Sequence, residues 1–273
     1  MRIALITEVW LPSINGVVTR LAATLRELQR QGNDVLVIAP EGADGDYAGA
    51  RVRGVPTVSV PFIYGGKPWG WPLPRVARWL REFAPDVVHV VNPVFLGIAG
   101  VVAADRLDLP LIASYHTDVP RYAAFYRLGW ASRQIWWVVR TLHNRAHLNL
   151  ATSDAALEVL RTHGVSAPRL WGPGVDADLF HPRHRPGCRS AVTKEPGSVV
   201  ALYVGRLGPE KGLHRLIPLA QSPGVHLLVV GEGPEEDQLR ATLEGPSVTF
   251  AGPLTGADLA AAYAAADVFV FPS

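Results

Sequence analysis

Short apolar runs alternate with helix-length segments along most of the chain. The pattern predicts strands at 2–7, 34–39, 55–60, 86–91, 110–115 and 147–151, and after an interruption at 199–204, 225–230, 247–251 and 267–271. Continuous Val, Ile and Leu runs such as 34–39 are typical of strands that are covered on both faces, as in parallel sheets. Between the first two strands, Val18, Leu21 and Leu25 keep helical spacing, and Gly32 is placed to end that helix. The alternation predicts an α/β fold with doubly wound parallel sheets.

The interruption at 181–197 is rich in Pro, Gly and charged residues and has no periodicity. Such a segment is typical of a linker, and 273 residues suit about two domains of ~150 residues. All eight tryptophans lie at or before Trp171. We therefore predict a first domain over 1–182, a linker over 183–197 and a second domain over 198–273.

The second domain is predicted to be incomplete. Its last strand, 267–271, has a preceding helix at 258–266 but is followed by no helix that could cover its other face. We expect the first domain to be well ordered, and the second to be looser and prone to aggregation.

Composition narrows the class of protein. Apolar residues make up 48% of the chain, which excludes a disordered protein, and a net charge of +2 gives no argument for nucleic-acid binding. Cys188 is the only cysteine, which fits a reducing compartment. The longest apolar run, 94–104, has 11 residues, fewer than the ~18 of a membrane span, and the first eight residues are typical of a strand. We expect a cytoplasmic protein, peripheral on the inner face of the cytoplasmic membrane.

The expected membrane contact depends on charge and helix geometry. Residues 51–145 hold 12 Lys and Arg against 5 Asp and Glu, and 119–153 contain no carboxylate. Helical spacing places Arg133, Trp137 and Arg140 on one face of 131–145. It also predicts a second exposed set, Arg75, Arg78 and Trp79, within 74–83. Arginine with tryptophan suits an anionic bilayer interface, although an ordinary solvent-facing helix has the same pattern.

Three glycine-bearing loops follow predicted strands and are candidates for binding a diphosphate. Asn15 and Gly16 open the first helix, where free N–H groups suit phosphate, although a simple turn explains them equally well. In 205–212, Arg206 and Lys211 bring two cations to one loop, and Lys211 is one of only three lysines. The third loop contains Gly231 and Gly233.

His116 and Asp118 follow the strand at 110–115, at the sheet edge where open α/β folds bind ligands. A histidine beside a carboxylate at this edge favours a functional role over a structural one. Two Asp-x-Asp pairs, Asp44 with Asp46 and Asp176 with Asp178, have no obvious third ligand. We therefore predict no metal site.

Six markers in order resemble the family 4 retaining glycosyltransferases. They are Asn15-Gly16, Tyr115-His-Thr-Asp118, Gly174-Val-Asp176 with Phe180 and Pro182, the Gly205-Arg206 to Gly212 loop, Gly231-Glu-Gly-Pro234, and Asp267 to Ser273. The resemblance covers essentially the whole chain and implies the type B fold, two Rossmann-like domains facing a cleft. Within the family, residues 114–122 and 169–176 are similar to two branches, the GDP-mannose-dependent α-mannosyltransferases and the sulfoquinovosyldiacylglycerol synthases.

The resemblance also implies residue roles. Arg206 and Lys211 would hold the diphosphate of a nucleotide-sugar donor, Gly16 would let the backbone approach the same phosphates, and His116 would orient the donor sugar. Gly231, Gly233, Asp118 and Asn15 would line the donor site. No metal or other cofactor is implied. The family's Glu-x7-Glu motif, which contacts the sugar and ribose, is expected after the position of Ser273.

These observations favour transfer of a hexose, with mannose favoured, from a nucleotide sugar to a lipid or glycolipid acceptor at a membrane surface. One alternative is a sulfoquinovosyl- or glucosyltransferase acting on diacylglycerol. Another is a non-catalytic sugar- or lipid-binding module. A Rossmann dehydrogenase is disfavoured because Gly-x-Gly-x-x-Gly is missing after the first strand of either domain.

Overall fold

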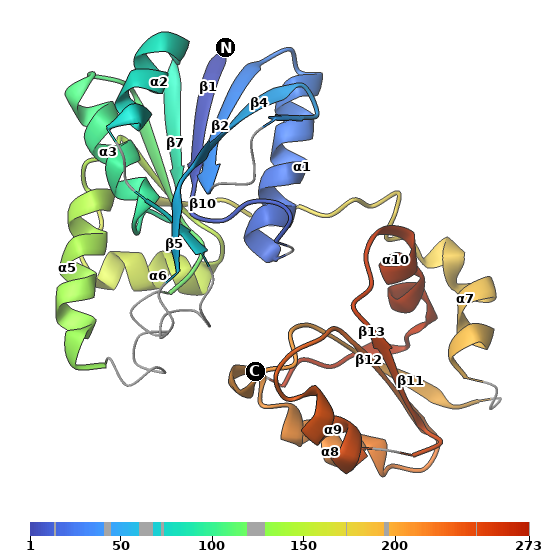
Figure 1. The fold of residues 1–273 in the computed structure, drawn as a ribbon. Helices are drawn as coiled ribbons and strands as arrows, with labels where there is room; N and C mark the ends of the chain where they lie inside the picture. Colours follow the sequence, from blue (N-terminus) through green and yellow to red (C-terminus); the bar gives the residue numbers. More distant parts are fainter. Residues whose placement is uncertain are drawn as a thin grey trace. The chain divides into compact units, whose positions relative to one another are not determined.

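The computed structural model describes residues 1–13, 15–40, 45–59, 68–71, 74–118, 129–172, 174–193, 197–243 and 245–272. The chain forms two compact units, Met1–Gly174 and Val175–Ser273 (Figure 1). We call them the N-terminal and C-terminal units and describe each by itself. The division falls eight residues before the end of the first domain that the sequence predicts.

The N-terminal unit is built on an eight-stranded sheet. Its strands are β1 (Arg2–Thr7), β2 (Asp34–Pro40), β3 (Gly45–Tyr47), β4 (Ala50–Val55), β7 (Val87–Val91), β8 (Leu111–Tyr115), β9 (Leu148–Ala151) and β10 (Pro168–Leu170). They are ordered β10-β9-β8-β7-β1-β2-β4-β3, and every pair is parallel except β3 with β4. The predicted doubly wound parallel sheet is confirmed.

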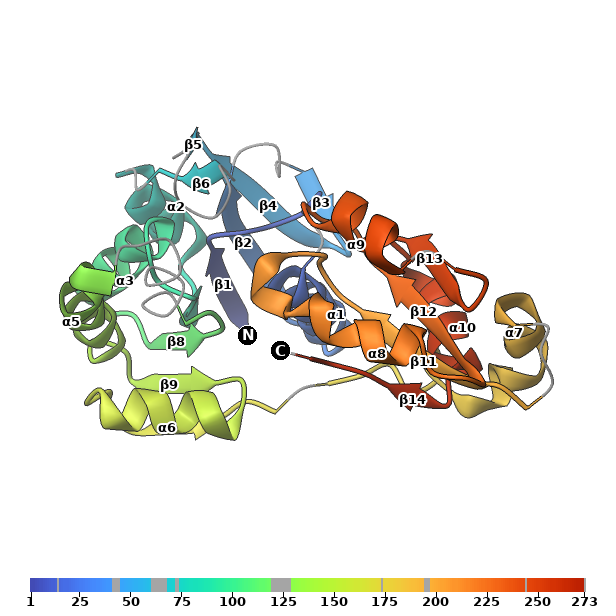
Figure 2. The same ribbon diagram turned by 90° about the horizontal axis from the view of Figure 1, so that it is seen from below.

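Helices cover both faces of this sheet, as Figures 1 and 2 show. They are α1 (Gly16–Arg30), α2 (Arg75–Phe83), α3 (Leu96–Arg106), α5 (Ser132–His143) and α6 (Asp154–Thr162), with a 3-10 turn, η2, at Gly129–Ala131. Alternation along β1 divides the core. Leu5 packs with α1, whereas Ala4 and Ile6 pack with α2 and α3 on the opposite face. The central strand is therefore buried on both sides, as its continuous apolar run indicates.

The structure differs from the predicted strand at 55–60. β4 ends at Val55, and β5 (Thr57–Ser59) instead pairs antiparallel with β6 (Pro68–Gly70) in a separate two-stranded sheet. Pro56 between them has no N–H to donate, so a single strand cannot run through it as a central ladder. The three-residue strands β3, β6 and β10 were not predicted because so short a segment has no readable period.

The C-terminal unit has a smaller parallel sheet. β11 (Val199–Val204), β12 (Val225–Val230), β13 (Val248–Gly252) and β14 (Val268–Phe269) are ordered β13-β12-β11-β14. The α-helices are α7 (Arg185–Val192), α8 (Ile217–Ala220), α9 (Glu236–Leu243) and α10 (Gly256–Ala265), with short turns η3 (Pro182–His184), η4 (Pro209–Lys211) and η5 (Leu213–Leu216). Two apolar clusters, one on each face of the sheet, form its core.

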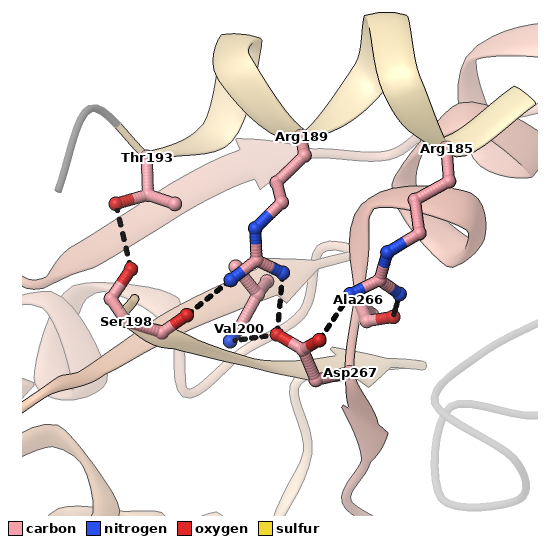
Figure 3. Close-up of polar contacts among 7 residues, drawn as sticks. All are labelled: Arg185, Arg189, Thr193, Ser198, Val200, Ala266 and Asp267. Carbon is pink, nitrogen blue, oxygen red and sulfur yellow. Dashed lines mark hydrogen bonds and ion pairs between the residues drawn. The ribbon is translucent and has the colours of Figure 1, made fainter. Parts of the chain in front are cut away.

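The segment predicted as a linker contributes a helix to this unit. α7 packs along α10, and its arginines bind the residues at the start of β14 (Figure 3). Arg189 Nη1 lies 2.5 Å from Asp267 Oδ2, Arg185 also bonds Asp267, and the backbone N–H of Val200 donates to Asp267 Oδ2 at 2.8 Å. The Arg189 and Val200 donors, with Arg185, hold the pKa of Asp267 at about 2. The Pro and Gly of 181–197 are typical of a linker. The contacts that place α7 in this unit depend on residues 78 to 82 positions further along the chain, so no local pattern indicates them.

We predict that Asp267→Asn lowers the unfolding free energy of the C-terminal unit by about 1–2 kcal/mol at pH 7, allowing for partial exposure. Because the folded pKa lies below the ordinary value of 3.8, this stabilisation is complete above about pH 4 and is lost as pH falls towards 2. Hydrogen exchange of β11 and β14 measures the difference. Asp258→Asn, on the exposed first turn of α10, is the control. Equal protection of wild type and Asp267→Asn at pH 7 would contradict the prediction.

β14 is the edge strand of the sheet and is partly exposed. Val268, Phe269 and Phe271 keep 44%, 46% and 52% of their surface exposed. The aromatic rings stack along this edge, with Phe269 between Tyr263 at 5.7 Å and Phe271 at 6.0 Å. The apolar cover that a doubly wound fold provides on both faces is therefore partial here. That the C-terminal unit is looser in solution stays a prediction.

Candidate functional site

The N-terminal unit has its topological switch point between β1 and β7, because the chain leaves β1 towards β2 on one side and later returns to β7 on the other. Ligands of open α/β sheets bind at the carboxyl ends of such strands. Directly after β1, the buried Glu8 carboxylate accepts backbone N–H bonds of 2.8–3.1 Å from Val94, Phe95, Leu96 and Gly97 at the start of α3. Burial raises the pKa of Glu8, and these four bonds oppose the rise. Glu8 therefore fixes the start of α3 beside the carboxyl end of β1.

His116 lies at this edge, one residue beyond β8. Its Nε2 lies 3.0 Å from Ser114 Oγ, and its backbone N–H donates to Asn92 Oδ1 at 3.3 Å. Asn92 follows β7 directly. The indole of Trp171 meets the imidazole edge to face with the ring centres 5.5 Å apart. His116 is therefore held by Ser114 of its own strand, by Asn92 after β7 and by Trp171 after β10.

Burial keeps three histidines of this unit, His89, His116 and His143, neutral. It lowers the pKa of His116 to about 4, and the positive charge of Arg20 contributes. It lowers the pKa of His89 to about 3, with His116 contributing, and that of His143 to about 4 against an opposing bond to Asn149. Asp118 lies close enough to Tyr115 to raise, together with burial, the pKa of that phenol.

We predict that the N-terminal unit loses stability on mild acidification. Folded pKa values of about 3 and 4 lie below the ordinary 6.5, so His89 and His143 stabilise the fold fully above pH 6.5 and lose this contribution as pH falls. Each should cost about 2–3 kcal/mol by pH 4.5. Glu8, whose pKa is raised, acts in the opposite direction.

Urea unfolding followed by tryptophan fluorescence between pH 7 and 4.5 measures this loss. The readout is specific because all eight tryptophans lie at or before Trp171, in the N-terminal unit. His214→Gln, which replaces an exposed histidine of the C-terminal unit, is the control and should leave the fluorescence transition of the N-terminal unit unchanged. An unfolding free energy that stays constant over this range would contradict the prediction.

The start of α1 lies near His116, since the charge of Arg20 on this helix affects that imidazole. Asn15 caps the helix, with its Oδ1 accepting the N–H groups of Val17 and Val18 at 3.0 Å. Gly16 is exposed, and a Cβ on it would meet no atom within 4 Å. One turn further on, Arg20 lies 4.2 Å above the Trp171 ring and donates to the carbonyls of Trp171 and Gly172. The helix end therefore has room for a ligand, whereas Asn15 uses its side chain for the cap.

In the C-terminal unit, two glycine loops pack backbone against backbone. Leu207 donates to the Glu232 carbonyl at 2.9 Å, and Glu235 donates to the Leu207 carbonyl at 3.0 Å. A Cβ on Gly231 would lie 1.9 Å from the Gly205 carbonyl oxygen, and Gly231 also has a φ of +132°. A Cβ on Gly233 would lie 2.2 Å from the Leu207 carbonyl oxygen. These glycines are needed for the close approach that fixes the 205–212 loop.

The two predicted cations lie on that fixed loop. Arg206 is exposed, and its Nη1 lies 3.6 Å from Glu210 Oε1. Tyr203 donates its hydroxyl to the Arg206 carbonyl at 2.9 Å, which holds the backbone under the guanidinium. Lys211 ends the turn η4, with its Nζ 5.1 Å from the centre of the Phe271 ring. The loop presents both charges at the carboxyl end of β11, where the sequence places them.

The acidic pairs take part in local turns where the structure describes them. Asp46 Oδ1 accepts from the Gly49 N–H, and Asp176 Oδ1 accepts from Asp178 and Leu179. Asp44 lies outside the described residues. Among the residues that are described, no three His, Cys, Asp or Glu side chains gather as a metal site.

The exposed face predicted for α5 is found in the structure, and the exposed face predicted for α2 is partly wrong. Arg133, Trp137 and Arg140 lie on the exposed face of α5, with Trp137 60% exposed, and Trp130 just before it is 77% exposed. On α2, Arg75 and Arg78 are exposed, but Trp79 is only 7% exposed and packs in the core. The reason is its spacing, because Val76, Trp79, Leu80 and Phe83 follow i, i+3, i+4, i+7 and form one apolar face. Residues 119–128, with Arg121 and Arg127, lie outside the described residues.

Several residues at this sheet edge have no role that the sequence predicts. They are Glu8, beside the start of α3, and the group around His116, namely Arg20, His89, Asn92, Ser114 and Trp171. Glu8 and Asn92 follow strands directly, so the strand-end rule that selected His116 would have found them. His89 interrupts the apolar run 87–91, which is a signal for a buried polar group with a partner. Arg20 and Trp171 are 151 positions apart, and no local pattern connects them.

These two doubly wound units, one with a histidine at the carboxyl edge of its sheet and one with a cationic glycine loop, have the architecture of type B glycosyltransferases. HepE from Anabaena, solved with UDP and glucose, matches 98% of this chain and 73% of its own chain at a TM-score of 0.70 and 20% identity. No helix in the described part of the chain is long and apolar enough to cross a membrane.

Family models match both units. Glycosyltransferase Family 4 matches residues 14–179, and Glycosyl transferases group 1 matches residues 198–273. A GDP-mannose-dependent alpha-mannosyltransferase of Mycolicibacterium smegmatis is 41% identical over 278 residues, covering 100% of this chain and 73% of the relative. A sulfoquinovosyl transferase of Arabidopsis thaliana is 34% identical, covering 100% of this chain and 55% of the relative. The chain belongs to glycosyltransferase family 4, and it is a glycosyltransferase.

Proposed function

We propose that this protein transfers mannose from GDP-mannose to a lipid or glycolipid acceptor, with retention of configuration, at an anionic membrane surface. The observation that carries the proposal is the loop with Arg206 and Lys211. The glycine contacts fix its backbone, Arg206 is exposed, and Lys211 is half-buried beside the Phe271 ring. The 41% identity to a GDP-mannose-dependent mannosyltransferase supports the choice of donor.

In the proposed reaction, the bond between the anomeric carbon of mannose and the diphosphate breaks while the acceptor hydroxyl oxygen bonds to that carbon. The hydroxyl proton passes to the leaving diphosphate. Arg206 and Lys211 offset the charge that develops on the leaving group, a role that a divalent ion has in other enzymes. We therefore propose that no metal is needed. Arg206 would exchange its 3.6 Å contact with Glu210 for the phosphate oxygens.

His116 is proposed to orient the donor sugar. Because burial lowers its pKa to about 4, its imidazole is neutral at physiological pH. A neutral imidazole can accept one hydrogen bond and donate another, which suits a sugar hydroxyl better than a charged ring does. Gly16 is proposed to let the donor phosphates approach α1.

Transfer of sulfoquinovose to diacylglycerol is the second candidate, and the 34% identity to the Arabidopsis sulfoquinovosyl transferase favours it. One experiment separates the two. The protein is incubated in diacylglycerol vesicles with an equimolar mixture of GDP-mannose, UDP-glucose and nucleotide-activated sulfoquinovose, and with the same mixture lacking each donor in turn. The masses of the product lipids are measured by mass spectrometry. A hexose added only when GDP-mannose is present supports the proposal. A sulfoquinovosyl product supports the second candidate, and binding without any product indicates a non-catalytic module.

The membrane contact is proposed to use the exposed face of α5 with Trp130. Trp137 and Trp130 give aromatic anchors, and Arg133 and Arg140 lie on the same side of the helix, opposite the buried Val139 and Leu142. Aromatic rings at the interface and arginines facing anionic headgroups are the two contributions that hold such helices on membranes.

We predict that Arg133→Glu/Arg140→Glu weakens binding to anionic vesicles roughly thirtyfold or more. Each arginine near an anionic surface contributes about 1 kcal/mol, and the carboxylates add repulsion. Co-sedimentation with vesicles of anionic and of neutral lipid measures it. Arg30→Glu/Arg161→Glu, two exposed arginines on α1 and α6, is the control with the same change in charge. Equal binding of the wild type to both lipids would contradict the contact.

A further inference from the structure

A single buried hydroxyl connects two imidazoles in the N-terminal unit. Ser114 is 0% exposed, and its Oγ lies 2.8 Å from His89 Nε2 and 3.0 Å from His116 Nε2. β7, which contains His89, pairs in parallel with β8, which contains Ser114. The three side chains form a chain of hydrogen bonds that begins inside the sheet and ends at the candidate site.

The number of available hydrogens limits how Ser114, His89 and His116 can be protonated. A serine hydroxyl has one hydrogen to donate, and each neutral imidazole carries one N–H. Ser114 therefore cannot donate to both rings. If both rings donated to it, its own hydrogen would need a third acceptor, and none is found for it among the described residues; a buried donor without a partner is costly. Two arrangements satisfy all three groups, and in each of them Ser114 donates to one Nε2 and accepts from the other.

The surrounding contacts keep both rings in place. The Trp171 ring centre lies 5.5 Å from the ring centres of both His89 and His116. Arg20 covers Trp171 at 4.2 Å, and Asn92 Oδ1 accepts from the backbone N–H groups of His116 and Thr117. Burial lowers the pKa of both histidines to about 3 and about 4, so both rings are neutral.

We propose that Ser114 and His89 are positioning residues that give His116 a single tautomer, and so determine whether its Nδ1 presents a proton or a lone pair to the sugar. The role of Nδ1 rests on the proposed function. The tautomer itself does not, because it is a property of the protein without substrate. His89 and His116 must then carry opposite protonation at Nε2.

Imidazole 15N NMR of the whole protein labelled at histidine tests this directly. His143 is an internal reference, because its Nδ1 lies 2.8 Å from Asn149 Oδ1, which can only accept a hydrogen bond, so the hydrogen is on Nδ1. Signals of the three rings are assigned with His89→Gln, His116→Gln and His143→Gln. We expect one tautomer for each of His89 and His116, with the proton on Nε2 in only one of them. The same Nε2 state in both rings, or a mixture of tautomers in His116, would overturn the proposal.

Variants then test the position of Ser114. Ser114→Ala should let the two tautomers of His116 exchange. Ser114→Thr keeps the hydroxyl and should restore a single tautomer. Ser166→Ala, at an exposed position, should leave the His116 spectrum unchanged. We expect Ser114→Ala to lower kcat roughly three- to tenfold with little change in the KM for donor. An unchanged His116 spectrum in Ser114→Ala would overturn the proposal, and the wild-type spectrum decides even if a variant fails to fold. If the wild type transfers no sugar, the proposed function fails, while the spectra still test whether Ser114 and His89 fix the tautomer of His116.

Discussion

Replacing either cation of the 205–212 loop is expected to weaken GDP binding about thirty- to a hundredfold. Arg206→Ala and Lys211→Ala each remove one charge-assisted contact to a phosphate, which contributes about 2–3 kcal/mol. The loop should keep its shape in both variants, because it is fixed by backbone contacts of Leu207 and by the Tyr203 hydroxyl on the Arg206 carbonyl.

Isothermal titration of GDP measures these affinities. Arg240→Ala is the matched control, because Arg240 is a cation of the same unit that is engaged on α9 with Glu236 at 2.8 Å. It should bind GDP as the wild type does. Wild-type affinity in both Arg206→Ala and Lys211→Ala would exclude this loop as the diphosphate site.

His116→Ala is expected to lower kcat about a hundredfold or more while the melting temperature falls by only a few degrees. A fall in kcat of this size is expected when one preorganised group that acts on the reacting sugar is removed. His116 is half-buried beside the strand end and contributes little to the apolar core, unlike His89 and His143 inside the fold. Removing it should therefore affect turnover more than folding.

The pH profile gives a second test of His116. Because its pKa of about 4 lies well below neutrality, turnover should show no decline from protonation of His116 between pH 8 and about 5. His163→Gln, which replaces an exposed histidine of the same unit, is the control for His116→Ala. A large loss of stability in His116→Ala, with normal activity of its folded fraction, would make His116 a structural residue instead.

The sequence was most informative where chemistry follows local rules. Apolar runs predicted β1, β2, β7 and β11, and the rule that strand ends bind ligands placed His116 and Arg206 correctly on their edges. The exposed side of α5 followed from a simple helical period. In each case, the signal is contained within about a dozen consecutive residues.

The sequence was least informative where the structure depends on distant partners. α7 belongs to the C-terminal unit because Arg185 and Arg189 meet Asp267, and nothing within 183–197 indicates that. Trp79 was placed outside because its charged neighbours dominated the pattern, although its own spacing matches the buried face. The group around His116 combines α1, β7, β8 and the segment after β10, which only the folded chain brings together.

The central claim is that this glycosyltransferase moves mannose from GDP-mannose to a lipid with retention of configuration. The most direct test is the anomeric configuration of the product, determined by NMR on glycolipid made by the protein from GDP-α-mannose. We predict an α-linked mannolipid, whose formation is strongly reduced in His116→Ala and Arg206→Ala. A β-linked product, or a sugar other than mannose on the lipid when several donors are offered, would contradict it.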